Sequence, residues 1–431
     1  MPVPLAYGAS NGVRAGRTTV RRTIVGIEFN ASDRTTLGVE WELQLVDVEN
    51  RHLRQEAEQV LAELPDLSET PSAPPLRHEL MQCTVEVVTG VCETVQEARE
   101  DLAGSVRRLQ GVLEPRGAAA ICAGTHPMDD WRDQAMSPVQ RYGELVDQMQ
   151  WLARRILTFG VHVHVGVRSA EKAVPIVNAL AGHLPHFLAL TASSPFWSGH
   201  DTGLASSRSI VFGALPTSGP PPVLPDWPAF EDYMATLLRA GTIAGIKEVW
   251  WDVRPHPDLG TVEIRMFDGI PTLREVGMAA ALTQSLVAHF DNLLDRGYRL
   301  PCRPSWVAND NKWRATRYGL DARIITDERG STVPLRDDLY ELVRELEPVA
   351  ARLGCADDLD VVSEVLDKGA SYERQRAIVR DGGTLDDVVD ALIAEFREGI
   401  GGTATGADRV GGGTAAAPPT PTNRGTSHAG T

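Results

Sequence analysis

Two histidines at alternate positions make the segment FGVHVHVGV, residues 159–167, a candidate for chemistry. If this segment is a β-strand, His162 and His164 project from the same face, because successive side chains of a strand point to opposite sides. An imidazole can bind a metal ion or exchange a proton near neutral pH. A single strand histidine is more often structural, however. For the pair, the sequence favours metal binding and a structural role about equally.

Carboxylates occur in the same alternating pattern in two earlier segments. In GVEWEL, Glu40 and Glu42 are expected on one face of a strand, and Glu86 is expected on one face of CTVEVVT. Glu79 is out of step with Glu86, so we expect it on the approach to that strand or beyond a β-bulge. Neighbouring carboxylates repel each other unless water or a cation separates them. For GVEWEL alone, an acidic face in water is the simpler interpretation.

A fourth segment, TVEIRMFD, places Glu263 and Arg265 on one face, which an ion pair would also explain. If the four segments form one sheet, their acids and imidazoles line a single cavity. Oxygen-rich ligands with one or two imidazoles suit Mg²⁺ or Mn²⁺ better than zinc. Such a cavity could hold a metal-bound polyphosphate, with arginine neutralising a transferred phosphoryl group. Because the sequence contains neither G-x-x-x-x-G-K-[ST] nor G-x-G-x-x-G, ATP would be held through metal and arginine.

Helices and one long loop are expected around these strands. Alternation predicts strands over residues 37–46, 83–89, 160–167 and 260–267, and apolar residues at every third or fourth position predict helices over 94–113, 276–294, 338–353 and 384–396. The proline-rich stretch 215–228 is expected to be a loop. The mixture predicts an α+β fold with helices packed on a mostly antiparallel sheet, in one domain over residues 34–398. Residues 1–33 are expected to be poorly ordered, and residues 399–431 to form a disordered tail.

The composition excludes several other classes of protein. With 42 Lys and Arg against 58 Asp and Glu, the formal net charge is −16, which argues against a nucleic-acid partner. No apolar stretch approaches the roughly 20 residues that cross a bilayer, so no membrane association is expected. The N-terminal residues lack an apolar signal segment, and the five cysteines are scattered without a C-x-x-C pair. We therefore expect a cytoplasmic protein with reduced thiols.

The order of several motifs resembles that of one known family. The chain contains, in sequence, GVEWEL, HELMQCTVEVVTGVC, GTHP, GVHVHVGV, LTASSPFWSGHDTGLASSR, LPTSGPP, WWDVRPHPDLGTVEIRMFD and NKWRATRYGLDA. This series is similar to the carboxylate–amine ligases of the second glutamate–cysteine ligase type. The resemblance implies the glutamine-synthetase-like catalytic fold, in which a curved, mostly antiparallel sheet forms an active-site funnel with helices on its outer face. Where the family usually has a third acid, this chain has Trp41, whose side chain we expect in the core.

The resemblance also implies residue roles. The implied metal ligands are Glu40, Glu42, Glu79, Glu86, Glu263, and His162 or His164. The implied catalytic residues are Arg265, Glu263 and Arg254, and nucleotide binding falls to Arg265, Arg254 and His162. Arg208, Thr202 and Ser206 are the implied substrate-binding residues, with Arg208 holding an α-carboxylate. An ion pair within the loop would explain Arg208 equally well.

The implied function is ATP-dependent ligation of glutamate and cysteine through an acyl phosphate, with Mg²⁺ or Mn²⁺ as cofactor. The expected partners are ATP and small amino acids, and a homodimer is the expected assembly. Two alternatives remain, namely the same chemistry on another acid and amine, and a nucleotide-binding regulatory protein without turnover. A metal-dependent hydrolase would need a compact motif such as H-E-x-x-H, which the sequence lacks.

Overall fold

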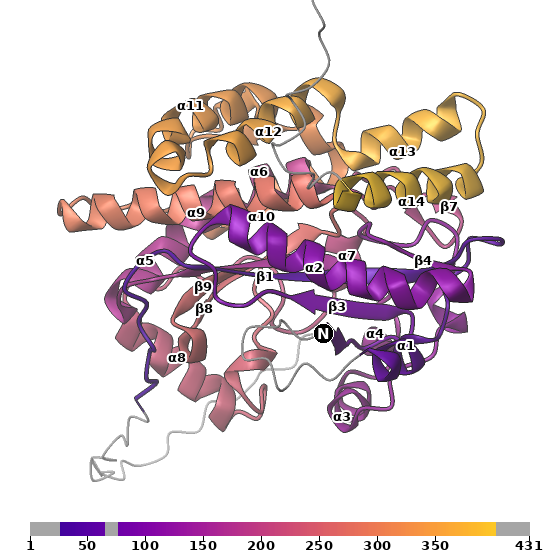
Figure 1. The fold of residues 1–431 in the computed structure, drawn as a ribbon. Helices are drawn as coiled ribbons and strands as arrows, with labels where there is room; N and C mark the ends of the chain where they lie inside the picture. The colour runs from indigo at the N-terminus through magenta and orange to yellow at the C-terminus, as the bar shows by residue number, and fades with distance from the viewer. Residues whose placement is uncertain (1–25, 65–75, 402–431) are drawn as a thin grey trace, which may run out of the picture.

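A computed structural model describes residues 26–64 and 76–401. Within them, one seven-stranded sheet has the order β2-β3-β1-β5-β9-β8, and β4 pairs with the C-terminal half of β1 (Figure 1). Every pair is antiparallel. The strands are β1 (Leu37–Asp47), β2 (Leu76–His78), β3 (Thr84–Val88), β4 (Ala118–Ile121), β5 (Gly160–Gly166), β8 (Val253–His256) and β9 (Thr261–Asp268). The four predicted strands are confirmed as β1, β3, β5 and β9.

Helices cover one face of the sheet in two layers, seen above the strands in Figure 1. The inner layer contains α2 (Val95–Leu113), α9 (Leu273–Asp295) and α14 (Leu385–Gly401), and the outer layer α11 (Leu335–Leu353) and α12 (Ala356–Lys368). The four predicted helices are confirmed as α2, α9, α11 and α14. The other helices are α1 (Ala57–Glu63), α3 (Gln140–Met149), α4 (Trp151–Arg154), α5 (Ala170–Leu180), α6 (Leu184–Thr191), α7 (Arg208–Phe212), α8 (Trp227–Arg239), α10 (Ser305–Tyr318) and α13 (Ser371–Arg380), and two hairpins pair β6 (Phe196–Trp197) with β7 (His200–Asp201) and β10 (Arg323–Ile325) with β11 (Thr332–Pro334).

Alternation in β1 divides the sheet into an apolar and a polar face. Leu37, Val39, Trp41, Leu43 and Leu45 are all buried. The Trp41 ring packs against Phe396 of α14, and its Nε1–H donates to the Ile270 carbonyl at 3.0 Å. Trp41 therefore belongs to the core, as predicted, and truncating such a residue typically costs about 3–5 kcal/mol.

The two longest helices on the sheet begin at threonines that satisfy free backbone N–H groups. The Thr94 hydroxyl accepts from the Glu97 N–H at the start of α2, and the Thr272 hydroxyl accepts from the Glu275 N–H at the start of α9. Such N-caps stabilise a helix by about 1 kcal/mol each. They fix where each helix begins, and so hold the apolar stripe of each helix in register with the sheet.

The segment 170–191 corrects the expectation that no apolar stretch is long enough to cross a membrane. It is long and apolar enough by composition, but 78% of its most apolar window is buried inside the protein. It comprises α5, a 3-10 turn at Ala181–His183 and α6, which pack against β9 and α9. The segment is therefore a core element of this fold.

Residues 26–33, here called the N-terminal strap, contact the domain although they belong to the segment expected to be poorly ordered. The Ile27 N–H donates to the Glu231 carboxylate at 2.8 Å, and the Asn30 N–H donates to the Pro257 carbonyl at 3.0 Å. Gly260 follows at the β8–β9 turn with φ of +65°, and a Cβ there would lie 1.6 Å from the Asn30 carbonyl oxygen. Glycine is thus required where the strap crosses this turn.

The other predicted boundaries are only partly covered by the described residues. Helix α14 continues to Gly401, past the expected domain end at residue 398. The rest of the expected N-terminal segment, residues 1–25, and most of the expected tail, residues 402–431, lie outside the described residues. Residues 215–226 form no helix or strand, in agreement with the predicted loop. All five cysteines are free.

Candidate functional site

The polar side chains singled out in the sequence lie on the face of the sheet opposite the inner helices. Strand register places three pairs directly across from each other, namely Glu42 with Glu86, Glu40 with His162, and His164 with Glu263. Acids and imidazoles therefore form one continuous row across β3, β1, β5 and β9. We call these six side chains together with Glu79 the acidic row. Its members are Glu40, Glu42, Glu79, Glu86, His162, His164 and Glu263.

Glu40 lies between the two histidines. Its Oε2 is 2.8 Å from the His162 Nδ1, and its Oε1 is 3.6 Å from the His164 Nε2. The His164 Nε2 is also 3.8 Å from Oε1 of Glu263. On the other side of its ring, the His164 Nδ1 lies 3.1 Å from the Thr261 hydroxyl, which orients the imidazole. The buried His164 Nε2 faces both carboxylates, but they are too far away for a hydrogen bond, so this nitrogen has no hydrogen-bond partner.

Glu79 joins the other end of the acidic row from the connection between β2 and β3. The Leu80 N–H donates to its carboxylate at 2.8 Å, and the Ser137 hydroxyl donates to its backbone carbonyl. Oxygens of Glu42, Glu79 and Glu86 lie within 4.8 Å of one another. Glu79 thus lies on the approach to β3, as its position out of step with Glu86 predicted.

The two ends of the acidic row differ in their charge balance. Burial acts to raise the pKa of Glu40, but the hydrogen bond with His162 and the nearby His164 imidazole outweigh it and lower the pKa. At the other end, burial and then the Glu79 carboxylate raise the pKa of Glu42 to about 8. Burial and three neighbouring carboxylates raise the pKa of Glu86 to about 9. This end carries excess negative charge, which a proton or a cation must balance.

The donor set of the acidic row fits a hard divalent cation. Three groups of potential ligands each have their donor atoms within 4.8 Å, and they are Glu40–His164–Glu263, Glu40–Glu86–His162 and Glu42–Glu79–Glu86. Every metal ligand implied by the sequence belongs to at least one of them. The groups share Glu40 and Glu86, so neighbouring ions could be bridged by a carboxylate. Mostly oxygen donors, together with the unpartnered His164 Nε2, match Mg²⁺ or Mn²⁺ better than zinc.

Two arginines hold Glu263 in place. The Arg254 Nε–H donates to Glu263 at 2.7 Å, and Arg265 donates to the other carboxylate oxygen. Burial acts to raise the pKa of Glu263, but Arg265 and then Arg254 outweigh it, and the pKa falls well below its usual range. Arg254 also donates to the Lys247 and Val249 carbonyls, at 3.0 and 2.6 Å. These contacts favour a positioning role for Arg254, and its contact with a nucleotide stays a prediction.

A β-bulge in β9 arranges the side chains that follow Glu263. Register pairs Val163 with Ile264 but Val161 with Phe267, so two residues of β9 stand opposite the single residue His162. The bulge keeps Arg265 beside Glu263 and shifts the alternation by one residue. Asp268, five positions after Glu263, consequently faces the same side of the sheet, opposite Gly160.

Arg208, at the start of α7, reaches the polar face from the loop after β7. Its side chain is 97% buried, and its guanidinium lies against Gly160, where an added Cβ would be 2.2 Å from Nη2. Nη2 donates to the Arg265 carbonyl at 3.3 Å, while Nε has no hydrogen-bond partner. Among the described residues, no carboxylate forms an ion pair with this guanidinium, so the geometry favours an anion-binding role over the alternative of a loop ion pair.

The two predicted substrate hydroxyls are bound within the protein. Thr202 donates to the Pro195 carbonyl at 2.9 Å, and Ser206 donates to Asp268 at 2.7 Å. Their contacts favour support of the loop that carries Arg208. Asp268 itself is fully buried and also accepts hydrogen bonds from the Ser194 hydroxyl and a backbone N–H. Sequence reasoning missed Asp268, because strict alternation places it on the opposite face, and no residue type in TVEIRMFD signals the bulge.

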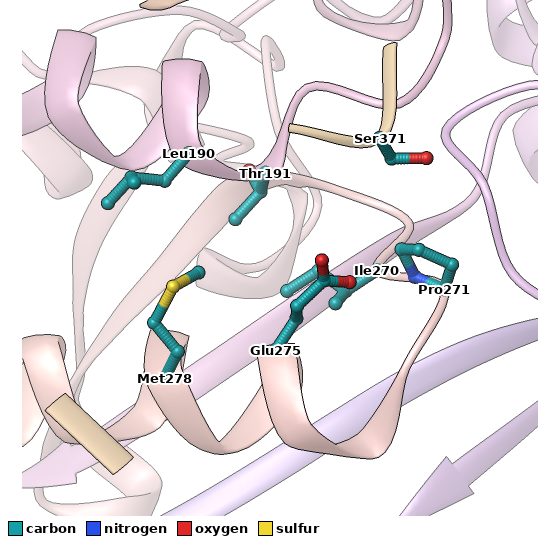
Figure 2. A pocket seen from close by; sticks show the side chains of 7 residues that line it. All are labelled: Leu190, Thr191, Ile270, Pro271, Glu275, Met278 and Ser371. Carbon is teal, nitrogen blue, oxygen red and sulfur yellow. The ribbon is translucent and has the colours of Figure 1, made fainter. Parts of the chain in front are cut away.

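Away from the acidic row, a pocket lies between α6, α9 and the start of α13, lined by the side chains in Figure 2. Glu275 points into it, and burial raises the pKa of this carboxyl although Arg374 lies 3.0 Å away. The walls leave no space for a water molecule. This pocket therefore does not compete with the acidic row as a substrate site.

Comparisons with known proteins identify relatives along most of the chain. The family model for Glutamate-cysteine ligase family 2 (GCS2) matches residues 36–391. The chain is 74% identical over 373 residues to "Putative glutamate--cysteine ligase 2" of Thermobifida fusca (strain YX), which covers 86% of this chain and 94% of that protein. It is 56% identical over 374 residues to "Putative glutamate--cysteine ligase 2-1" of Frankia casuarinae, and this match covers 86% of this chain and 98% of that protein.

Two solved structures share the fold. A glutamate–cysteine ligase from Francisella tularensis in complex with AMP matches with a TM-score of 0.62 and 11% identity, over 86% of this chain and 93% of that chain. A bifunctional glutathione synthetase from Pasteurella multocida matches with a TM-score of 0.59 and 16% identity, over 85% and 52%. At these identities the likeness concerns the fold alone, and it confirms the predicted fold class.

Proposed function

Because this chain belongs to glutamate–cysteine ligase family 2 and is an enzyme of the carboxylate–amine ligase type, we propose that it joins L-glutamate to L-cysteine. The proposed products are γ-glutamylcysteine, ADP and phosphate, formed through γ-glutamyl phosphate. A free carboxylate is a poor acylating agent, so its activation by ATP is the step that makes attack by an amine feasible. The proposed setting is the cytoplasm, with ATP and the two amino acids as partners.

One observation carries this proposal. The acidic row combines seven potential ligands with Arg265 at its edge on one wall of an antiparallel sheet. Phosphoryl transfer depends mainly on positioning and on balancing the charge of phosphate oxygens, which is what such a wall can provide. Burial and mutual repulsion raise the pKa values of Glu42 and Glu86, and a bound cation would relieve that repulsion by displacing their protons.

The residues of the acidic row would hold Mg²⁺ or Mn²⁺, and Glu263 would do so in an orientation that Arg254 and Arg265 fix. Bound metal would supply charge neutralisation for the phosphate oxygens of ATP. Arg265 would bind the transferred phosphoryl group, since its guanidinium is held at the edge of the row by Glu263. His162, hydrogen-bonded to Glu40, would complete the ligand set or contact the nucleotide.

Arg208 would hold the α-carboxylate of glutamate. Its buried guanidinium, with Nε unpartnered, can take a carboxylate in a bidentate grip at Gly160, next to Glu42. Thr202 and Ser206 would keep the loop in position for this contact, since their hydroxyls already bind Pro195 and Asp268. The distance along the sheet between Arg208 and Arg265 would then set the length of acid accepted.

An ADP-release assay with Mg²⁺, glutamate and a panel of amines, cysteine first, tests the proposal. Release that requires both glutamate and cysteine supports it, and release without an amine contradicts ligation. Faster release with another acid or amine would contradict the substrate pair while leaving the ligase chemistry in place. Glu42→Gln should abolish turnover, whereas the matched change Glu341→Gln on the exposed side of α11 should not.

A further inference from the structure

A basic cavity lies away from the acidic row, where α11, α12 and α13 meet. It has a volume of about 320 Å³, which is within the range of small-molecule sites. Its charged lining residues are Arg336, Lys368, Arg374, Arg380, Asp367 and Glu373. Four cations face two anions here, in a chain whose net charge is −16. The proposed ligation reaction makes no use of this cavity.

The cavity already accommodates one carboxylate, which belongs to Glu373 in the first turn of α13. One of its oxygens accepts from Arg336 at 2.9 Å, and the other accepts from the Ala370 N–H at 2.9 Å. Arg336 is also held by a hydrogen bond to the Leu366 carbonyl at 2.7 Å and by an ion pair with the exposed Asp321 at 3.3 Å. The inner wall of the cavity therefore combines a held guanidinium with the N-terminus of a helix, and both favour anions.

Two further cations at the mouth of the cavity are only loosely engaged. Lys368 pairs with Glu364 at 3.2 Å and Arg380 with Asp381 at 3.2 Å, and these basic side chains are 72% and 74% exposed. Exposed pairs of this kind contribute little, so a ligand can displace them easily. Arg374 differs, because it is held by Glu275 and Glu395 at 3.0 Å each.

We propose that this cavity binds a small metabolite that carries two or more carboxylate or phosphate groups. One anionic group would lie at the mouth between Lys368 and Arg380. A second would lie deeper, beside Arg336 and the start of α13, sharing the position that Glu373 occupies. Two separated positive zones favour a molecule with two anionic ends over a single small ion.

The position of α13 gives this site a route to the sheet. On the side of α13 away from the cavity, the Tyr372 N–H donates to the Ala192 carbonyl at 2.9 Å and the Gln375 amide donates to the Ser193 carbonyl at 2.8 Å. The Ser193 N–H in turn donates to Asp268 at 3.1 Å. A ligand that orders α13 would therefore also restrain residues 193–208, the loop that carries Arg208.

Thermal unfolding of the metal-free protein in EDTA, with citrate and pyrophosphate as separate probes, tests the site. We expect a saturable rise in the midpoint with at least one probe, compared with potassium chloride at the same ionic strength. Citrate alone would identify a carboxylate site, and pyrophosphate alone a phosphate site. In the double variant Lys368→Gln/Arg380→Gln, the apparent Kd for the effective probe should rise about tenfold or more. The control Arg344→Gln, which replaces an exposed arginine elsewhere on α11, should leave this Kd unchanged.

No saturable rise with either probe would overturn the proposal. An equal rise in the double variant would also overturn it, since that result places the anion elsewhere, for instance at Arg208 and Arg265. Hydrogen exchange measured with the effective probe should show slower exchange in residues 193–208. Unchanged exchange there would refute the route through α13. These readouts need no turnover, so they are independent of the proposed ligase activity.

Discussion

Replacement of Arg254 would show whether this arginine holds the acidic row in place or contacts the nucleotide directly. Its guanidinium is buried and makes three hydrogen bonds, one to Glu263 and two to the Lys247 and Val249 carbonyls. Arg254→Lys keeps a positive charge near Glu263, but a single ammonium cannot reach all three acceptors. Arg254→Met removes the charge and leaves Glu263 with Arg265 alone.

The contacts set the size of the expected effects. In the lysine variant, loss of two hydrogen bonds from a charged donor should lower the free energy of unfolding by about 2–3 kcal/mol. In the methionine variant, a buried carboxylate loses one of its two partners as well, and the loss should reach about 3–5 kcal/mol. Mg²⁺ binding should weaken in both variants, because Glu263 is no longer held from the β8 side.

Denaturant unfolding in EDTA would measure the stability of each variant, and calorimetry would measure Mg²⁺ and ATP binding separately. Arg344→Met, at an exposed arginine, should match the wild type in all three measurements. The reasoning would be refuted if Arg254→Lys unfolded at the wild-type denaturant concentration while its ATP affinity fell. That combination would assign Arg254 to the nucleotide and not to the support of Glu263.

Three further predictions concern the loop and the periphery of the site. Gly160→Ala should raise KM for glutamate, because the added Cβ would lie 2.2 Å from the Arg208 Nη2. The control Gly104→Ala, whose Cβ would meet nothing within 4 Å, should leave KM unchanged and add about 0.5–1 kcal/mol of stability. Equal KM values for Gly160→Ala and the wild type in steady-state assays would contradict the role of Arg208. Asp268→Ala should lower the free energy of unfolding by about 3 kcal/mol in urea titrations, because three buried donors lose their acceptor, and a loss under about 1 kcal/mol would argue against this account. Burial lowers the pKa of His126 from 6.5 to about 4. The free energy of unfolding should therefore keep this contribution above pH 6.5 and fall by about 3 kcal/mol as the pH drops to 4. In His126→Gln, unfolding measured across the same pH range should show a smaller fall.

Alternation along single strands was enough to predict most of the acidic row. Glu40, Glu42 and Glu86 lie on one face for the reason given by the pleat, and the two histidines join them because β5 pairs with β1. What alternation cannot supply is the order of the strands. The resemblance to a known family implied one mostly antiparallel sheet but no strand order. The observed order and register explain how residues more than 200 positions apart, such as Glu40 and Glu263, become neighbours.

Features that depend on long-range packing were beyond the sequence patterns. The bulge that turns Asp268 toward the polar face has no local signature, and it lies just beyond Ile264, the last residue of β9 in register with β8. The partners of Arg254 include carbonyls of a 3-10 turn whose position only the folded chain defines. The composition of residues 26–33 likewise gave no sign of their contacts, which include Glu231 and Pro257 far along the chain.

The N-terminal strap has a practical consequence for shortened forms of the protein. It crosses the turn that joins two site-bearing strands, and the Ser32 N–H donates to the Val167 carbonyl at the end of the strand that carries both histidines. A protein that begins at residue 34 would lose these contacts at the end of β5 and at the β8–β9 turn. The side chains of His164 and Glu263 on β5 and β9 would then be held less rigidly. Shortened forms intended for crystallisation or calorimetry should therefore keep residues 26–33.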